Sequence, residues 1–473
     1  MLDLVLPPSQ NAELLEALET RFDEVVTALC RIDVRNALAG RDSDRIAILA
    51  AVEEGAGVGA VNARVHDRLR GWLVTQARAM VAARRAASGE AHPTTLRAEV
   101  LLAQLLRQDG HNDDAAVLLR RVVQCRKATL GAAHDDTLTA TFLLAQNATS
   151  GMPHNAKSLY EEVLTHRQAA QGDAHPETLL CLGQLASLVP SALNTVLAEK
   201  LAREALRRSR AAHGNDHRVT LENVYILAEV MRNVARCGHT DGTSNFLSGN
   251  QDAKLRAAAF AEAESLLRAS VIGFAALLGP RHPETLVAMH SHAHALLDVR
   301  PAEEDDGATV AAARAEARAQ MQLVLSISRE VDGEGHPSML AYCLTLANLL
   351  ARDDAVDEAV PLYEACVRNR RDAAGTIRRS SVSACVAYSR MLVRAGRYAE
   401  AEPLQRDILE EKTAMLGLAF CASLSFVNDL VTTLRAQGKH AEAEAELLLA
   451  SAAVADERRR ASAAPPGDDA FEG

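Results

Sequence analysis

The feature that most constrains this chain is an eight-residue segment that recurs at a nearly fixed interval. It reads GEAHPTTL at Gly89 and returns as GAAHDDTL, GDAHPETL, GNDHRVTL, GPRHPETL and GEGHPSML. Two diverged copies follow, GTIRRSSV at Gly375 and GLAFCASL at Gly417. The first glycines of consecutive copies lie 42, 41, 42, 65, 54, 42 and 42 residues apart. A constant period of this length indicates a repeat architecture, and the two longer intervals predict insertions near 237–256 and 299–309.

Alanine recurs at two fixed places in each unit, sixteen residues before a segment glycine and fourteen residues after one. Small side chains at set intervals let two helices cross closely, because a larger side chain would force the backbones apart. We therefore expect these positions to be buried helix crossings. The first set is Ala115, Ala156, Ala198, Ala263, Ala317, Ala359 and Ala401, with Ala443 in the last copy, and the second is Ala103, Ala145, Ala186, Ala228, Ala293 and Ala347, relaxing to Ser389 and Val431.

Apolar residues between these markers follow helical spacing, as in Leu138, Phe142 and Ala145. The segment glycine suits the end of one helix, where a left-handed residue costs least, and the proline suits the first turn of the next. Aromatic residues make up only 3% of the chain, and alternating Val, Ile and Thr runs are missing, which argues against β-sheet. One helical hairpin cannot bury its own apolar face, so the sequence predicts an all-α, right-handed superhelical solenoid of stacked helix–turn–helix units.

The segment GRYAEAEPLQRDILEEKTAMLG (396–417), together with GDAHPETL, resembles the repeat of the kinesin light chain-like tetratricopeptide proteins. The resemblance covers residues 89 to about 455. It implies a non-catalytic scaffold or adaptor that binds partner proteins or peptides through the solenoid groove and edge loops. An alternative within the family is a cargo adaptor subunit of a motor, which in the family carries a much longer heptad region than this chain shows.

Eight repeats are expected over residues 89–456, flanked by two different ends. Residues 1–88 lack a clean repeat and are expected to form a helical N-terminal cap, in which helices near 43–54 and 60–88 could be a degenerate leading repeat. Upstream, Leu15, Leu18, Phe22, Val25, Leu29 and Ile32 have three–four spacing, which predicts a capping helix or, alternatively, a short dimer-forming coil. Residues 457–473 have the composition of a disordered tail.

The groove of such a solenoid is lined by the first helix of each unit. In the resembled family an asparagine pair on that helix helps to hold extended peptides, and Asn428 alone keeps asparagine at the first position of the pair. The first positions are otherwise more apolar and the second more polar, so we expect a partner with apolar side chains, or else a groove partly filled by its own side chains. The candidate groove residues are Gln104, Phe142, Gln146, Tyr225, Glu229, His290, His294, Asn348, Arg390 and Asn428.

Other motifs point only weakly to chemistry. His290 and His294 have i,i+4 spacing that suits a metal, and a metal-dependent enzyme is the alternative of a different class, but H-E-x-x-H is absent. GAGVGA (55–60) follows a helix-like stretch, whereas a dinucleotide fingerprint follows a strand. We therefore expect no catalysis, no cofactor and no metal. Ser462 and Ser381 follow paired arginines and are candidate phosphorylation sites.

Charge and cysteine content bound the partners and the compartment. The net charge is −11, which argues against nucleic acid as a partner. The eight cysteines are scattered without a C-x-x-C pair, which favours a reducing compartment. No stretch approaches eighteen uncharged apolar residues, so membrane insertion is not expected and the cytoplasm is the predicted location.

Overall fold

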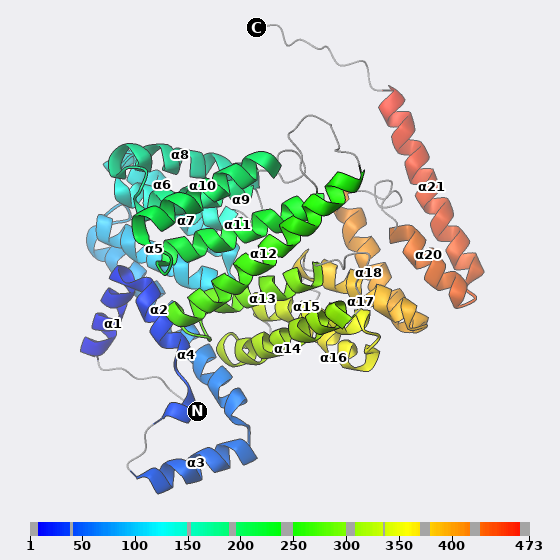
Figure 1. The fold of residues 1–473 in the computed structure, drawn as a ribbon, viewed down its shortest axis with the longest axis horizontal. Helices are drawn as coiled ribbons and strands as arrows, with labels where there is room; N and C mark the ends of the chain where they lie inside the picture. Colours follow the sequence, from blue (N-terminus) through cyan, green and yellow to red (C-terminus); the bar gives the residue numbers. More distant parts are fainter. Residues whose placement is uncertain are drawn as a thin grey trace. The chain divides into compact units, whose positions relative to one another are not determined.

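The computed structural model describes residues 8–37, 41–148, 153–188, 195–237, 249–298, 308–333, 336–368, 379–416 and 426–463, and every regular element among them is a helix (Figure 1). The predicted all-α class is therefore confirmed. The chain forms two compact units, Met1–Met339 and Leu340–Gly473. No single described helix is long and apolar enough to cross a membrane, although the pair Ser43–Glu54 and Val58–Ser88, bent by 95°, passes that test of length and composition together.

The first unit opens with four helices and a 3₁₀ turn, and helix pairs follow it along the chain. In each pair we call the first helix A and the second helix B. The opening elements are α1 (Pro8–Thr20), α2 (Phe22–Cys30), η1 (Val34–Asn36), α3 (Asp42–Glu54) and α4 (Val58–Ser88). The pairs are α5 (Pro93–Gln108) with α6 (Asn112–Leu130), α7 (Asp135–Ala148) with α8 (Pro153–Gln171), α9 (Pro176–Leu188) with α10 (Thr195–His213), α11 (Arg218–Cys237) with α12 (Gly249–Leu278), and α13 (Pro283–Asp298) with α14 (Ala308–Val331).

The second unit continues the same alternation, with α15 beginning at the unit boundary. Its pairs are α15 (Pro337–Arg352) with α16 (Val356–Val367), α17 (Arg379–Arg394) with α18 (Tyr398–Leu416), and α20 (Phe426–Ala436) with α21 (His440–Ala463). The last helix corrects one expectation, because α21 includes residues 457–463 of the predicted disordered tail. Ala, Glu and Arg dominate that stretch and favour helix, and the first proline comes only at Pro465. Residues 464–473 lie outside the described part.

The predicted insertions lie mostly outside the described residues. In the first one, however, residues 249–256 are helical, because α12 begins at Gly249 and runs to Leu278. The physical reason is composition: the turn-forming residues end near Gln251, and the alanine-rich sequence beyond them favours helix. Residues 238–248 and 299–307 are not described.

The alanine pattern is confirmed as a set of buried helix crossings. Every residue of both sets, including Ser389 and Val431, is at most 5% exposed. Within the first unit each helix packs on the next helix in the chain, from α4 through α14. The small residues therefore stand where consecutive helices approach, as the spacing predicted.

The recurring segment has a structural task at several of its positions. The glycine has a positive φ between 82° and 96° in all six clear copies, which ends helix B. The histidine Nδ1 then accepts a hydrogen bond from the backbone N–H two residues later, at 3.2–3.4 Å, and so caps the N-terminus of helix A. The threonine six residues after the glycine donates to the glycine carbonyl in three copies, through Thr95, Thr220 and Thr285. The capping histidine was not anticipated from the sequence.

We expect His282→Asn to reduce the loss of stability between pH 6.5 and pH 5.5. Burial, and then the charge of Arg218, lower the pKa of His282 to about 4, while Asp23 opposes the shift and Arg31 adds to it. The unfolded state therefore binds a proton that the folded state refuses, so stability is lost as the pH falls below the unfolded pKa, by about 1 kcal/mol over this interval. Asparagine keeps an acceptor at the cap and removes the titration. Urea unfolding at both pH values measures the difference, with His440→Asn as the control; equal pH dependence in all three proteins would contradict the expectation.

The N-terminal helix predicted over residues 15–32 is two helices. The chain leaves helical geometry at Arg21, where φ is −139° and ψ is 48°, and the apolar residues on either side have different targets. Leu15 and Leu18 join the core cluster of α4 and α5, whereas Val26 and Cys30 pack against Val331. Phe22, Val25 and Leu29 of the predicted spacing are partly buried and pack against these clusters. The dimer-forming coil stays an alternative prediction.

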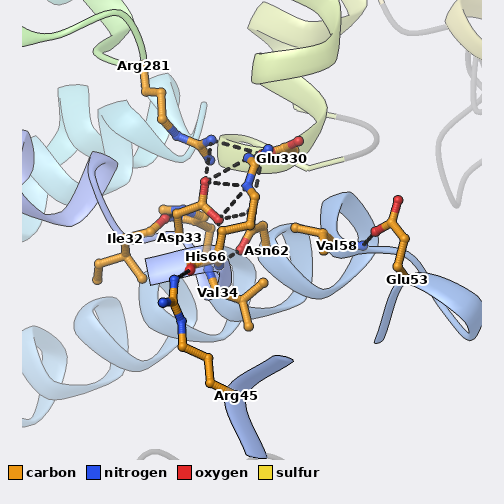
Figure 2. Close-up of polar contacts among 11 residues, drawn as sticks. Ile32, Asp33, Val34, Arg45, Glu53, Val58, Asn62, His66, Arg281 and Glu330 are labelled. Carbon is orange, nitrogen blue, oxygen red and sulfur yellow. Dashed lines mark hydrogen bonds and ion pairs between the residues drawn. The ribbon is translucent and has the colours of Figure 1, made fainter. Parts of the chain in front are cut away.

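A polar network ties this N-terminal segment to the fifth helix pair. Asp33 accepts a hydrogen bond from Arg281 at 3.2 Å, and Glu330 of α14 accepts from Arg281 at 2.9 Å and from Asn62 of α4 at 3.2 Å. Figure 2 shows these side chains converging from the N-terminal segment, α4 and the fifth pair. Burial alone would raise the pKa of Asp33, but hydrogen bonds from Arg35 hold it well below its usual range.

Further contacts close the first unit on itself. The helix α4 packs along α14, and the Arg70 guanidinium donates to the carbonyls of Val331 and Asp332. The Nε2 of His336 donates to the Gln108 carbonyl at 2.8 Å. The beginning of the array therefore meets the residues that follow its fifth pair. The first unit is one superhelical turn whose two ends touch.

Candidate functional site

A cavity of about 600 Å³ lies where the A helices of the first unit face one another. Its walls come mainly from α5, α7, α9, α11 and α13, and α2 adds Phe22 and Asp23. Gln104, Phe142 and Gln146 of the predicted groove set line it. The volume lies within the range of small-ligand and short-peptide sites, which runs from roughly 300 to 1,000 Å³.

An aromatic and cationic floor is built around Phe142. Its ring meets Tyr160 edge to face, with centroids 5.4 Å apart, and the Arg167 guanidinium lies 5.2 Å from the Phe142 centroid. Arg167 is only 1% exposed, and its Nη2 pairs with Glu177 Oε2 at 2.7 Å. Its charge is thus compensated, and Arg126 in the preceding repeat likewise donates to a backbone carbonyl of the next helix A. The burial of Arg167 is therefore explained by its contacts with the next helix A, without a ligand.

One side of the cavity is rich in amides around a single guanidinium. The Nη1 of Arg107 donates to Gln146 Oε1 at 3.2 Å, and among the described residues no carboxylate pairs with this arginine. Burial lowers the pKa of Arg107, which indicates a poorly solvated charge. The amides on this side belong to Gln104, Gln108, Asn112, Gln146 and Asn147. Amides and a guanidinium are groups that bind peptide backbone and carboxylates.

The opposite side gathers three carboxylates around one arginine. Arg218 pairs with Asp23 at 2.5 Å, with Glu222 at 2.9 Å and with Glu284 at 2.5 Å. Burial, and then the negative charge of Glu284, raise the pKa of Glu222 to about 7. Burial also raises the pKa of Glu284. This side carries more negative than positive charge whenever all three carboxyls are ionised.

These charged residues were missed in the sequence. A signal existed for Arg218, which replaces the proline of the recurring segment in GNDHRVTL. No comparable sequence signal placed Phe22 and Asp23 at the cavity. Their helix lies far from the repeats along the chain and reaches the cavity only through the closure of the first unit.

The remaining predicted groove residues of the first unit do not line this cavity. Tyr225 donates to or accepts from Ser291 Oγ at 3.1 Å, and burial raises its pKa to about 12. Glu229 accepts from Arg232 at 2.8 Å. Tyr225 packs into three neighbouring core clusters, so this part of the A-helix surface is filled by the protein's own side chains, as the alternative expectation described.

The histidine pair of the fifth repeat is a ring contact. His290 and His294 lie edge to face with centroids 4.7 Å apart. Burial, and then the neighbouring His294, lower the pKa of His290 to about 3, so that ring is neutral at physiological pH. Within the described part of the chain, no group of three or more His, Cys, Asp or Glu side chains is arranged to hold a metal ion.

The predicted residues of the second unit do not form one site. Asn348 Oδ1 accepts a hydrogen bond from the Tyr363 hydroxyl at 2.6 Å, and Arg390 pairs with Asp429 at 3.6 Å. Asn428 lines a separate apolar pocket of about 570 Å³ between α20 and α21. Asn348, Arg390 and Asn428 therefore contact different partners and do not line a common pocket.

The two candidate phosphorylation sites differ in what the structure describes. Ser381 lies near the start of α17 and is only 7% exposed, so a kinase would need that helix to open. Ser462 belongs to the last turn of α21, and its side chain lies outside the described residues.

Comparison with known families addresses the repeats directly. The tetratricopeptide repeat family model matches residues 101–136, which run from α5 through α6 into α7. Helix pairs of the same construction continue beyond this stretch at the 42-residue period. Residues 101–136 are therefore similar to the tetratricopeptide repeat family.

Solved structures with related folds were also found. A Podosopora anserina protein named for kinesin light chain, with nearly identical TPR-like repeats, is 22% identical, covers 50% of this chain and 97% of its own, and has a TM-score of 0.33. A Rap protein in complex with Competence and Sporulation Factor is 11% identical, covers 82% and 98%, and has a TM-score of 0.40. A circular tandem repeat protein is 13% identical, covers 94% and 99%, and has a TM-score of 0.22. No curated protein matches this repeat protein significantly.

Proposed function

We propose that this protein is a non-catalytic scaffold or adaptor that binds partner proteins or peptides through the groove of its first unit and through its edge loops. The observation that supports this most is the cavity among the A helices, which places amides, a guanidinium and an aromatic ring on one concave surface. A helical repeat array commonly uses such a concave surface for binding. The cysteines are scattered along the sequence without a C-x-x-C pair, which favours a reducing compartment for this scaffold, and we propose the cytoplasm.

The chemistry of the lining favours binding over catalysis. None of the described residues that line the cavity is a serine, cysteine or histidine. The described lining therefore holds no Ser–His or Cys–His pair of the kind used in covalent catalysis. Glu222 has the pKa of a general base, but it is held by Arg218.

The motor-subunit alternative predicts a particular partner. If the protein is a cargo adaptor of the kinesin light chain type, kinesin heavy chain should co-purify with it from cells. Capture of other partners without heavy chain would favour a free-standing scaffold.

Filling the groove should abolish partner binding. We expect Gln104→Trp to reduce capture of partner proteins by at least about 10-fold, because the indole would occupy the cavity that Gln104 now lines. Arg120→Trp on the exposed face of α6 is the matched control. Affinity purification with partner identification, and thermal unfolding to confirm folding, make the comparison. Hydrogen exchange should show partner protection on α5, α7 and α9; protection confined to other helices would contradict the groove assignment.

A further inference from the structure

The closed first unit limits what can enter its cavity. The walls belong mainly to five A helices of one superhelical turn, and contacts such as His336 to Gln108 join the ends of that turn. A volume of about 600 Å³ accommodates a ligand of a few residues, not a folded domain. The occupant that fits is therefore a short segment of chain in extended form.

The two sides of the cavity carry opposite charge. Arg107 is the lining cation for which the described residues supply no carboxylate, whereas Arg167 has Glu177 and Arg218 has three carboxylates. A ligand carboxylate would meet its uncompensated partner at Arg107. A ligand cation would be attracted to the carboxylates around Arg218.

Buried polar atoms without hydrogen-bond partners occur at the same cavity. They are Asn147 Oδ1 on the amide side, Glu284 Oε2 on the acidic side and Arg167 Nε at the floor. Leaving such atoms unsatisfied is unfavourable, so polar sites of this kind usually contact a ligand or water. Backbone amides and charged side chains of a peptide supply both donors and acceptors.

We propose that this cavity binds a short extended peptide segment that carries a carboxylate for Arg107 and a basic side chain for the carboxylates around Arg218. The amides of the α5–α7 side pair with the peptide backbone, and Phe142 contacts an apolar side chain. This proposal rests on the proposed function and specifies the partner of the same groove. The carboxylate is either an acidic side chain or the free C-terminus of the segment.

Blocked peptide pools test the charge pattern with the full-length protein. Fluorescent hexapeptide pools, acetylated and amidated, would contain one Glu and one Lys, Glu alone, Lys alone, or neither. A fifth pool would replace Glu by a free C-terminal carboxylate. Fluorescence polarisation should show the tightest binding for a pool with both charges, with about 10-fold weaker binding for each charge removed. The fifth pool shows which source of carboxylate is preferred.

Variants assign each charge to its side of the cavity. Arg107→Gln should weaken carboxylate-bearing pools about 10-fold and leave the Lys-only pool unchanged, while Glu222→Gln should weaken the Lys-bearing pools. Arg107→Glu should prefer basic over acidic pools, which is a gain that unfolding cannot imitate. Arg97→Gln, an exposed arginine on the same helix α5, is the matched control and should leave all pools unchanged.

The outcomes separate this proposal from the proposed function. If the neutral pool binds as tightly as the charged pools and Gln104→Trp abolishes that binding, the groove is a binding site but the charge pattern is wrong. If no pool binds while partner proteins are captured, the scaffold remains and the cavity proposal is overturned. If neither peptides nor proteins bind, both proposals fail.

Discussion

Replacing both Arg85 and Arg121 by methionine should lower the free energy of unfolding by about 3–5 kcal/mol, because it leaves a buried carboxylate without a cation. The Glu99 side chain of α5 is fully buried, at 0% exposure. Its Oε1 accepts from Arg85 Nη2 at 2.8 Å and pairs with Arg121 of α6. Both arginines are partly exposed, so water can solvate their charges without Glu99. The Glu99 carboxylate has no such contact with water, and its desolvation is therefore the main source of the lost stability.

Adding Glu99→Met to this double variant should recover most of the lost stability, because the triple variant has no buried charge left to desolvate. Arg97→Met with Arg120→Met, which removes two exposed arginines from α5 and α6, is the matched control and should change stability by less than about 1 kcal/mol. Urea unfolding followed by circular dichroism, together with hydrogen exchange in α5 and α6, measures the stability of the double, triple and control variants. An equal loss in the control double, or no recovery in the triple variant, would show that the arginines act by packing alone.

The sequence predicts the repeat unit well because its determinants are local. A glycine that ends helix B, a proline at the start of helix A and an alanine at each crossing act within one or two neighbouring helices. All three patterns are found in the structure, in the positive φ of Gly89, the place of Pro93 in the first turn of α5, and the full burial of Ala103 and Ala115. Even the capping histidine acts over two residues, and its constant place before helix A was the available signal.

The site depends on features that a repeat period does not encode. The pitch of a superhelix accumulates from small rotations between neighbouring repeats, so the return of α14 to α4 is invisible in the spacing of glycines. Asn62 donates to Asp33 within the N-terminal part of the chain, whereas Glu330 joins Asn62 through that return. The same closure brings Asp23 to Arg218, across 195 residues of sequence. Gln104, Phe142 and Gln146 could be chosen because they lie on neighbouring A helices, whereas the residues that give the cavity its charge pattern could not.

Gly183 marks the place where the predicted groove is occupied by the protein itself. It occupies the position on α9 that corresponds to Phe142 on α7, 41 residues earlier, but α11 packs against α9. A Cβ added to Gly183 would lie 2.1 Å from Asn223 Oδ1 and 3.1 Å from Ile226 Cδ1. Asn223 is 1% exposed, and its Nδ2 donates to Ser209 Oγ at 2.9 Å. The missing side chain therefore permits the close approach of two A helices.

We expect Gly183→Ala to lower the free energy of unfolding by about 2–3 kcal/mol, because the methyl group displaces a buried, hydrogen-bonded amide. Gly71→Ala is the matched control: Gly71 is an exposed position inside α4 where an added Cβ meets nothing within 4 Å. There the same substitution should stabilise by roughly 0.5–1 kcal/mol, because alanine favours helix over glycine. Adding Asn223→Ala to Gly183→Ala makes room for the methyl group, so the double variant should be more stable than the sum of the single changes predicts. Additive effects, or a stabilising Gly183→Ala, would mean that α9 and α11 do not approach as closely as the structure has them, and that the groove stays open at the third repeat.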